Sequence, residues 1–174
     1  MNLWGIALYT LRAFAFALIA WLAYALLSRA RRRRPTWGGR LTIFYLAALF
    51  QITVLRGGVE WDGFFSAPRA AVQWIPLQTT LDQLRRGTWP FLYHVVGNLA
   101  WFVPMGFLAR RKPAWVALAL GAVFSAFIEG MQWALMTGMP DVDDVLLNAT
   151  GALVGRLLAG VVGTGNRFRS QKAG

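Results

Sequence analysis

Three pairs of polar side chains stand inside apolar stretches, at spacings that place each pair on one face of a helix. The pairs are His94 with Asn98, Glu129 with Gln132, and Asp144 with Asn148. Charged and amide side chains in a membrane span are costly, so each needs a partner or a function. We therefore take these six residues, together with Asp143, as candidate ligand-binding positions.

Glu129 is the strongest candidate for catalysis, because a carboxyl group among lipid-facing residues needs a partner or a proton. It could act as a general base. The neighbouring carboxylates of Asp143 and Asp144 could hold a divalent metal such as Mg²⁺ through a substrate phosphate.

Simpler structural roles remain open for the other polar residues. Asp141 and Asp144 could cap the helix that follows them and complement its dipole. Asn98 and Asn148 could form hydrogen bonds between helices. His94 could serve as a structural donor near the membrane boundary.

Composition places most of the chain in lipid. Of the 174 residues, 57% are hydrophobic and 14% are charged, and the mean hydropathy is +0.46. Soluble domains carry about 45–50% apolar and about 25% charged residues. The absence of Cys and the single His exclude disulfides, thiolate nucleophiles and His-rich metal sites. No cofactor is indicated.

Hydropathy predicts an all-α polytopic membrane helix bundle with about five transmembrane helices and one short interfacial helix. The expected spans are 3–27, 41–55, 89–109, 114–136 and 142–162. The second is short for the bilayer and is bracketed by Arg40 and Arg56. Thr80 to Gln83 has the spacing of a capping box, which predicts a short helix that begins there and is stopped by Gly87.

The basic residues set the expected orientation, because cytoplasmic loops retain Lys and Arg. Segments 29–40, 110–112 and 167–172 contain Lys or Arg and no acid. They fall on one side of a five-span arrangement, with the N-terminus outside and the C-terminus in the cytoplasm. The net charge of +11 is explained by this topology, so no nucleic-acid partner is expected. Arg12, inside the first span, either snorkels outward or neutralises Glu129.

Three sequence blocks resemble the VanZ-like family over residues 74–160. They are residues 74–79 with Pro76, residues 97–108 with the Phe-x-Pro-x-Gly-Phe motif, and residues 141–152 with Asp-Asp-x-x-x-Asn-x-x-Gly. The positions that match the family pattern are Pro76, Asn98, Pro104, Gly106, Glu129, Gln132, Asp144, Asn148, Gly151 and Gly155. One departure is Gly138-Met139-Pro140, which stands where the family often has an Arg before the acidic run.

The resemblance implies a multi-pass protein of the bacterial cytoplasmic membrane, in a family associated with resistance to the glycopeptide teicoplanin. We expect an outward-facing polar cluster that acts on or near lipid-linked cell-wall material, without catalysis. Membrane lipid is an expected partner, and a homo-oligomer is left open. Two alternatives remain: a metal-assisted hydrolase or transferase acting on a lipid carrier, and a proton-linked small transporter.

We expect three regions along the chain. Residues 1–73 would form an N-terminal two-helix membrane region with an outer aromatic connection. Residues 74–163 would form a VanZ-like three-helix core, and residues 164–174 a disordered cytoplasmic tail.

Overall fold

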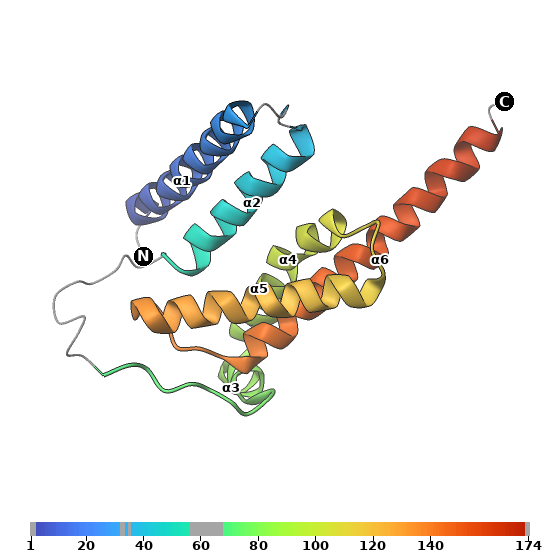
Figure 1. Ribbon diagram of the computed structural model, residues 1–174. Helices are drawn as coiled ribbons and strands as arrows, with labels where there is room; N and C mark the ends of the chain where they lie inside the picture. Colours follow the sequence, from blue (N-terminus) through green and yellow to red (C-terminus); the bar gives the residue numbers. More distant parts are fainter. Residues whose placement is uncertain (1–2, 32–33, 35, 56–67, 173–174) are drawn as a thin grey trace. The chain divides into compact units, whose positions relative to one another are not determined.

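The computed structural model describes residues 3–31, 34, 36–55 and 68–172, and every regular element in these ranges is a helix (Figure 1). The helices are α1 (Leu3–Ala30), α2 (Trp37–Thr53), α3 (Gln78–Arg86), α4 (Thr88–Leu108), α5 (Ala114–Leu135) and α6 (Val142–Lys172). The all-α class is therefore confirmed. Much of the aromatic connection expected before residue 68 lies outside the described residues.

Four of the described helices are long and apolar enough to cross a membrane. The candidate spans are Leu11–Ala30, Thr88–Leu108, Ala114–Leu135 and Val142–Val162. Their outward faces are apolar: Leu11 is 63% exposed, and Val123 and Val161 are each 70% exposed. Because exposed apolar surface on this scale suits lipid rather than water, the chain is a multi-pass membrane protein.

The expected second span is not among these four candidates. Thr36 caps the start of α2, where its Oγ1 accepts the backbone N–H of Gly39 at 3.1 Å. The helix then has 17 residues. At 1.5 Å per residue it is about 26 Å long, a little short of the roughly 30 Å hydrocarbon core.

The chain divides into two compact units, and the first comprises Met1–Arg69 with Met131–Gly138. Within it, α1 and α2 form an antiparallel pair. The rings of Phe14 and Phe44 meet edge to face with centroids 5.7 Å apart, and the Arg40 guanidinium lies over the Trp21 ring. Ala13 and Ala17, one turn apart on α1, are buried. Their small side chains allow close contact between helices.

The second unit comprises Ala70–Gly130 with Met139–Gly174, and its core is the contact between α4 and α6. These helices run parallel. A Cβ atom at Gly151 would collide with the carbonyl of Leu99, and one at Gly155 with the carbonyl of Val103. Gly106 lies equally close to the α6 backbone. The helices therefore meet backbone to backbone, as small residues spaced by four predict.

α5 packs antiparallel to α6 at a similarly small-residue position. A Cβ atom at Gly121 would lie 2.8 Å from the Cβ of Ala152 and 2.9 Å from the Cα of Ala149. α5 also contacts α4, where the rings of Phe102 (α4) and Phe124 (α5) have centroids 6.3 Å apart. The second unit thus brings together parts of α4, α5 and α6, and the three-helix core expected over residues 74–163 stays a prediction.

One local expectation differs from the structure. α3 begins at Gln78 after Leu77, and it has no side-chain cap of its own, so Thr80 to Gln83 does not form a capping box. α6 is described to Lys172, and the disordered tail expected from residue 164 stays a prediction. α4 also continues through Pro104 to Leu108.

We predict that Gly155→Ala destabilises the second unit, because its new methyl group would collide with the Val103 carbonyl. The expected loss in the free energy of unfolding is about 1–3 kcal/mol, the usual cost of overpacking. The measurement is the thermal unfolding midpoint of the purified chain in detergent.

The matched control is Gly97→Ala on α4, where a Cβ atom would meet nothing within 4 Å. That change should leave stability unaltered or raise it by about 1 kcal/mol, because Ala favours helix. Equal midpoints for both variants would contradict the close contact between α4 and α6.

Candidate functional site

The start of α6 is fixed by backbone and side-chain hydrogen bonds within the second unit. The Asp141 Oδ1 atom accepts the backbone N–H of Asp143 at 2.9 Å, which caps the helix. The Gln73 carbonyl accepts the N–H of Val142 at 3.0 Å, and the Pro140 carbonyl accepts the N–H of Gln73 at 2.8 Å. The segment before α3 and the first turn of α6 therefore hold each other in place.

Glu129 supports the same turn from α5. Its Oε2 atom accepts the backbone N–H of Asp141 at 2.9 Å, and the side chain is only 6% exposed. The carboxylate thus positions the loop that leads into α6. This contact gives Glu129 a structural role, and its role as a general base stays a prediction.

Asp143 caps α3 from a different helix. Its Oδ2 atom accepts the backbone N–H of Thr80 at 2.8 Å and the Thr80 hydroxyl at 2.9 Å, and its Oδ1 atom accepts the N–H of Leu77. The side chain is 1% exposed. Three donors and the positive end of the α3 dipole compensate for burying this carboxylate.

Leu77 takes a left-handed backbone conformation, with φ of 65°. This conformation costs a residue with a side chain about 1–2 kcal/mol. The bond from the Leu77 N–H to Asp143 offsets that cost. The turn into α3 therefore depends on a carboxylate that lies 66 residues further along the chain.

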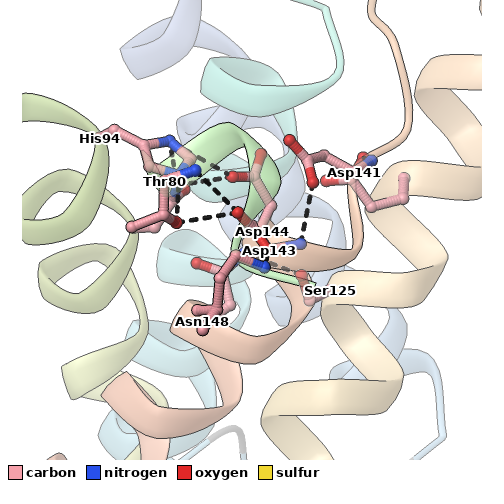
Figure 2. A network of polar contacts seen from close by, with 10 residues as sticks. Thr80, His94, Ser125, Asp141, Asp143, Asp144 and Asn148 are labelled. Carbon is pink, nitrogen blue, oxygen red and sulfur yellow. Dashed lines mark hydrogen bonds and ion pairs between the residues drawn. The ribbon is translucent and has the colours of Figure 1, made fainter. Parts of the chain in front are cut away.

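His94 and Asn98 of α4 extend this arrangement to Asp144 (Figure 2). The Asn98 amide donates to Asp144 Oδ1 at 2.7 Å and lies 3.5 Å from His94 Nδ1. His94 Nε2 lies 3.3 Å from the Thr80 hydroxyl oxygen, whose proton goes to Asp143. We call Thr80, His94, Asn98, Asp143 and Asp144 the polar network.

The donors and acceptors of the polar network favour one tautomer of His94. If Nε2 carries the proton, it donates to Thr80, and Nδ1 is free to accept from the Asn98 amide. The alternative contact, from Nδ1 to Asp144 Oδ1, spans 3.7 Å and is too long for a hydrogen bond. With this tautomer, His94 links Thr80 at one end of the network to Asn98 at the other.

Asp144 is the exposed end of the polar network. Its side chain is 29% exposed, whereas that of His94 is 12% exposed. Within the described residues only Oδ1 of Asp144 is hydrogen-bonded, so Oδ2 is available to a ligand. The network thus ends in a partly exposed carboxylate that can accept hydrogen bonds.

Asn148 lies deeper between α5 and α6. Its amide donates to Ser125 Oγ at 2.8 Å, and the residue is 4% exposed. Its buried Oδ1 atom has no hydrogen-bond partner among the described residues. The predicted interhelical hydrogen bond of Asn148 is therefore present, and Asn98 makes one as well.

Hydrogen bonds link five of the predicted site residues, because Glu129 reaches Asp143 through Asp141, and the other two bond elsewhere. His94, Asn98, Asp143 and Asp144 join one network, while Glu129 contacts Asp141 and Asn148 contacts Ser125. Gln132 belongs to the first unit, where its amide donates to the Thr53 carbonyl at 3.0 Å and its side chain lies against Gly138. Arg12 of α1 is exposed.

The donor set does not fit the metal site considered for Asp143 and Asp144. Both oxygens of Asp143 already accept hydrogen bonds from α3. Across the described residues, no group of three or more His, Cys, Asp or Glu side chains is arranged to hold an ion. The buried aspartate caps a helix instead.

Sequence reasoning missed Thr80 as a member of this network, because it placed Thr80 at the start of a self-capped helix. Ser125, which accepts the Asn148 amide, is also absent from the residues predicted for the site. A signal existed for the first of these residues: the first turn of α3 contains no acidic residue of its own. A helix start without a local cap requires an acceptor from elsewhere.

We predict that Asp143→Asn loosens α3, because an amide offers one acceptor oxygen where the carboxylate offers two. Losing part of this cap should lower the free energy of unfolding by about 1–3 kcal/mol. Hydrogen exchange of the α3 amides, followed by mass spectrometry, should become faster.

The control for this prediction is Asp82→Asn, which removes the same charge from α3 itself. Asp82 bonds the exposed Arg85 at 2.9 Å, a surface pair of little energetic weight. If the α3 amides exchange at the same rate in both variants, the capping role assigned to Asp143 is wrong.

The family comparison agrees with this geometry. The model of the VanZ/LLP1 family matches residues 42–163, a range that begins within α2 and contains the whole polar network. Neither the curated proteins nor the solved structures contain a match to the chain. Because the family match covers well over half of the sequence, the chain belongs to the VanZ/LLP1 family.

Proposed function

We propose that this protein binds lipid-linked cell-wall material at the outer face of the bacterial cytoplasmic membrane, and thereby lowers the engagement of teicoplanin with its target. The polar network is the proposed binding site. The protein acts by binding, and no reaction is assigned to it.

The single observation that carries this proposal is the free oxygen of Asp144. The other carboxylates near the start of α6 are committed to the fold, whereas Asp144 is 29% exposed with one oxygen available. A carboxylate oxygen accepts hydrogen bonds, so it favours a ligand rich in hydroxyl or amide donors. The sugars and the peptide of a lipid-linked cell-wall precursor offer such donors.

The distribution of charge supports an outward position for the network. Arg110, Arg111 and Lys112 follow α4 at one end of the second unit. The polar network lies at the opposite end, where α4 and α6 begin. Because cytoplasmic loops retain basic residues, the network then faces outward.

The same charge pattern requires α2 to cross the membrane. The basic residues at the end of α1 and those after α4 share the cytoplasmic side only if an even number of crossings separates them. With α4 as one crossing, α2 supplies the other. Its 17 residues are at the lower limit for a span.

We predict that Asp144→Asn abolishes the protection against teicoplanin in a sensitive host expressing the chain. Losing a hydrogen bond to a charged acceptor should weaken ligand binding by about tenfold or more. The measurement is the minimal inhibitory concentration, together with surface binding of labelled teicoplanin at matched expression.

Asp82→Asn serves as the matched control, because it removes an acidic charge from α3 without touching the network. It should protect as well as the unaltered chain. Protection by Asp144→Asn equal to that of the control would overturn the assignment of Asp144. An unaltered chain that gives no protection, although correctly inserted, would overturn the link to teicoplanin.

The predicted topology can be tested with single introduced cysteines, because the chain has no Cys of its own that would give background labelling. In intact cells, a membrane-impermeant maleimide should label Cys at Ala70 and Met139, and should not label Cys at Ala30 and Ala114. Ala70 and Met139 lie after α2 and α5, whereas Ala30 is the last residue of α1 and Ala114 is the first residue of α5.

The control is the same labelling after the cells are opened, when all four positions should react. If α2 does not cross, Ala30 and Ala70 will respond alike in intact cells. That result would contradict five crossings and remove the basis for an outward-facing network.

A further inference from the structure

The first unit contains a hollow of about 390 Å³ where α1 ends and the connection to α2 begins. It is lined by Tyr24, Leu27, Ser28, Arg31, Arg34 and Thr36. Three of these side chains carry hydroxyl groups and two carry guanidinium groups. All five polar groups can donate hydrogen bonds, so the lining suits an anion.

We propose that this hollow binds the phosphate group of an anionic phospholipid, with Arg31 and Arg34 as the charged partners and Tyr24, Ser28 and Thr36 as hydroxyl donors. This site is separate from the polar network and does not depend on the proposed function.

The charges of this region have no counter-ion within the chain segment that forms it. The sequence contains no Asp or Glu before Glu60. Among the described residues, neither Arg31 nor Arg34 is part of a salt bridge. An anion that pairs with them must therefore come from outside this segment, and the phosphate of a lipid lies at the depth where a span ends.

Arg40 adds a third positive charge to the first unit, although it does not line the hollow. Its guanidinium lies 5.2 Å from the ring centroids of both Trp21 and Trp37, and its buried Nε atom has no hydrogen-bond partner among the described residues. Contact with two aromatic rings holds this cation in a fixed place. Trp37 is 71% exposed, and exposed tryptophans favour the headgroup zone of a bilayer.

The start of α2 contributes to the same electrostatic field. Thr36 lines the hollow and also caps α2, whose first turn contains Gly38 and Gly39. The phenol of Tyr24 lies against Gly39, where a Cβ atom would collide with the hydroxyl oxygen. Gly39 therefore allows Tyr24 to reach the start of α2, where the helix dipole is positive.

The apolar part of the occupant is indicated by α1. Leu22, Leu26 and Leu27 are 47%, 64% and 59% exposed on the turns that lead to the hollow, and Leu27 also lines it. A phospholipid bound through its phosphate can lay its acyl chains along these leucines. A free phosphate ion has no acyl chains and would not contact these leucines.

The test is native mass spectrometry of the full chain, purified in detergent and titrated with dioleoyl phosphatidylglycerol. We expect one saturable tight site for this lipid. Arg31→Gln with Arg34→Gln should weaken it by about 100-fold or more, because each lost charge-assisted hydrogen bond to the phosphate contributes about tenfold or more in affinity. The double variant keeps Arg29, Arg32 and Arg33, so the charge that sets topology remains.

Arg29→Gln is the matched control, because Arg29 is exposed on the last turn of α1 and does not line the hollow. It should leave phosphatidylglycerol binding nearly unchanged. A loss as large as that of the double variant would show general surface attraction and overturn the site. Tyr24→Phe, which changes no charge, should weaken binding by about fivefold, and unchanged binding would remove Tyr24 from the site.

Two further titrations distinguish the sources of the phosphate. Dioleoyl phosphatidylcholine should not compete, because its headgroup carries no net charge. Millimolar inorganic phosphate should not displace phosphatidylglycerol, because the ion lacks acyl chains. Effective competition by phosphatidylcholine would overturn the anionic requirement, and displacement by phosphate would overturn the lipid as occupant.

Discussion

The arrangement of the second unit depends on one buried carboxylate. Asp143 sits in the first turn of α6 and accepts three hydrogen bonds from the start of α3, so it joins two helix N-termini. A helix N-terminus presents free N–H groups and a positive dipole, which a carboxylate satisfies without a cation. These bonds hold Thr80 beside His94. His94 in turn contacts Asn98, whose amide donates to Asp144. Without this cap, α3 would no longer hold Thr80 in the polar network.

The close contact between α4 and α6 makes these short polar distances available. Gly151 and Gly155 bring the α6 backbone against Leu99 and Val103, and the same register places Asn98 within 2.7 Å of Asp144. In lipid, helices gain little from burying apolar side chains against each other, so backbone contact and interhelical hydrogen bonds carry more of the association. The glycine contacts and the polar network are thus two parts of one interface.

Hydropathy predicts α4 and α5 to within a residue or two, because lipid imposes the length and the composition of a span. The small residues at 106, 151 and 155 likewise predict a helix contact. The partners of the polar side chains were harder to predict, since they depend on the path of a connection with no periodic pattern. Gln73 and Thr80 reach α6 through that connection, and Gln132 bonds Thr53 within the first unit. The spacing of residues along one helix shows which side chains share a face of that helix. It does not identify the residue of another segment that contacts them.

The missing basic residue before the acidic run has a physical explanation in these contacts. Asp141 accepts the N–H of Asp143, and Glu129 accepts the N–H of Asp141, so both carboxylates already have backbone donors. Gly138-Met139-Pro140 therefore leaves neither carboxylate without a hydrogen bond. Asp144 differs, because one of its oxygens has no partner among the described residues. A donor supplied by the proposed ligand would act at that oxygen, because the other oxygen of Asp144 already accepts the Asn98 amide.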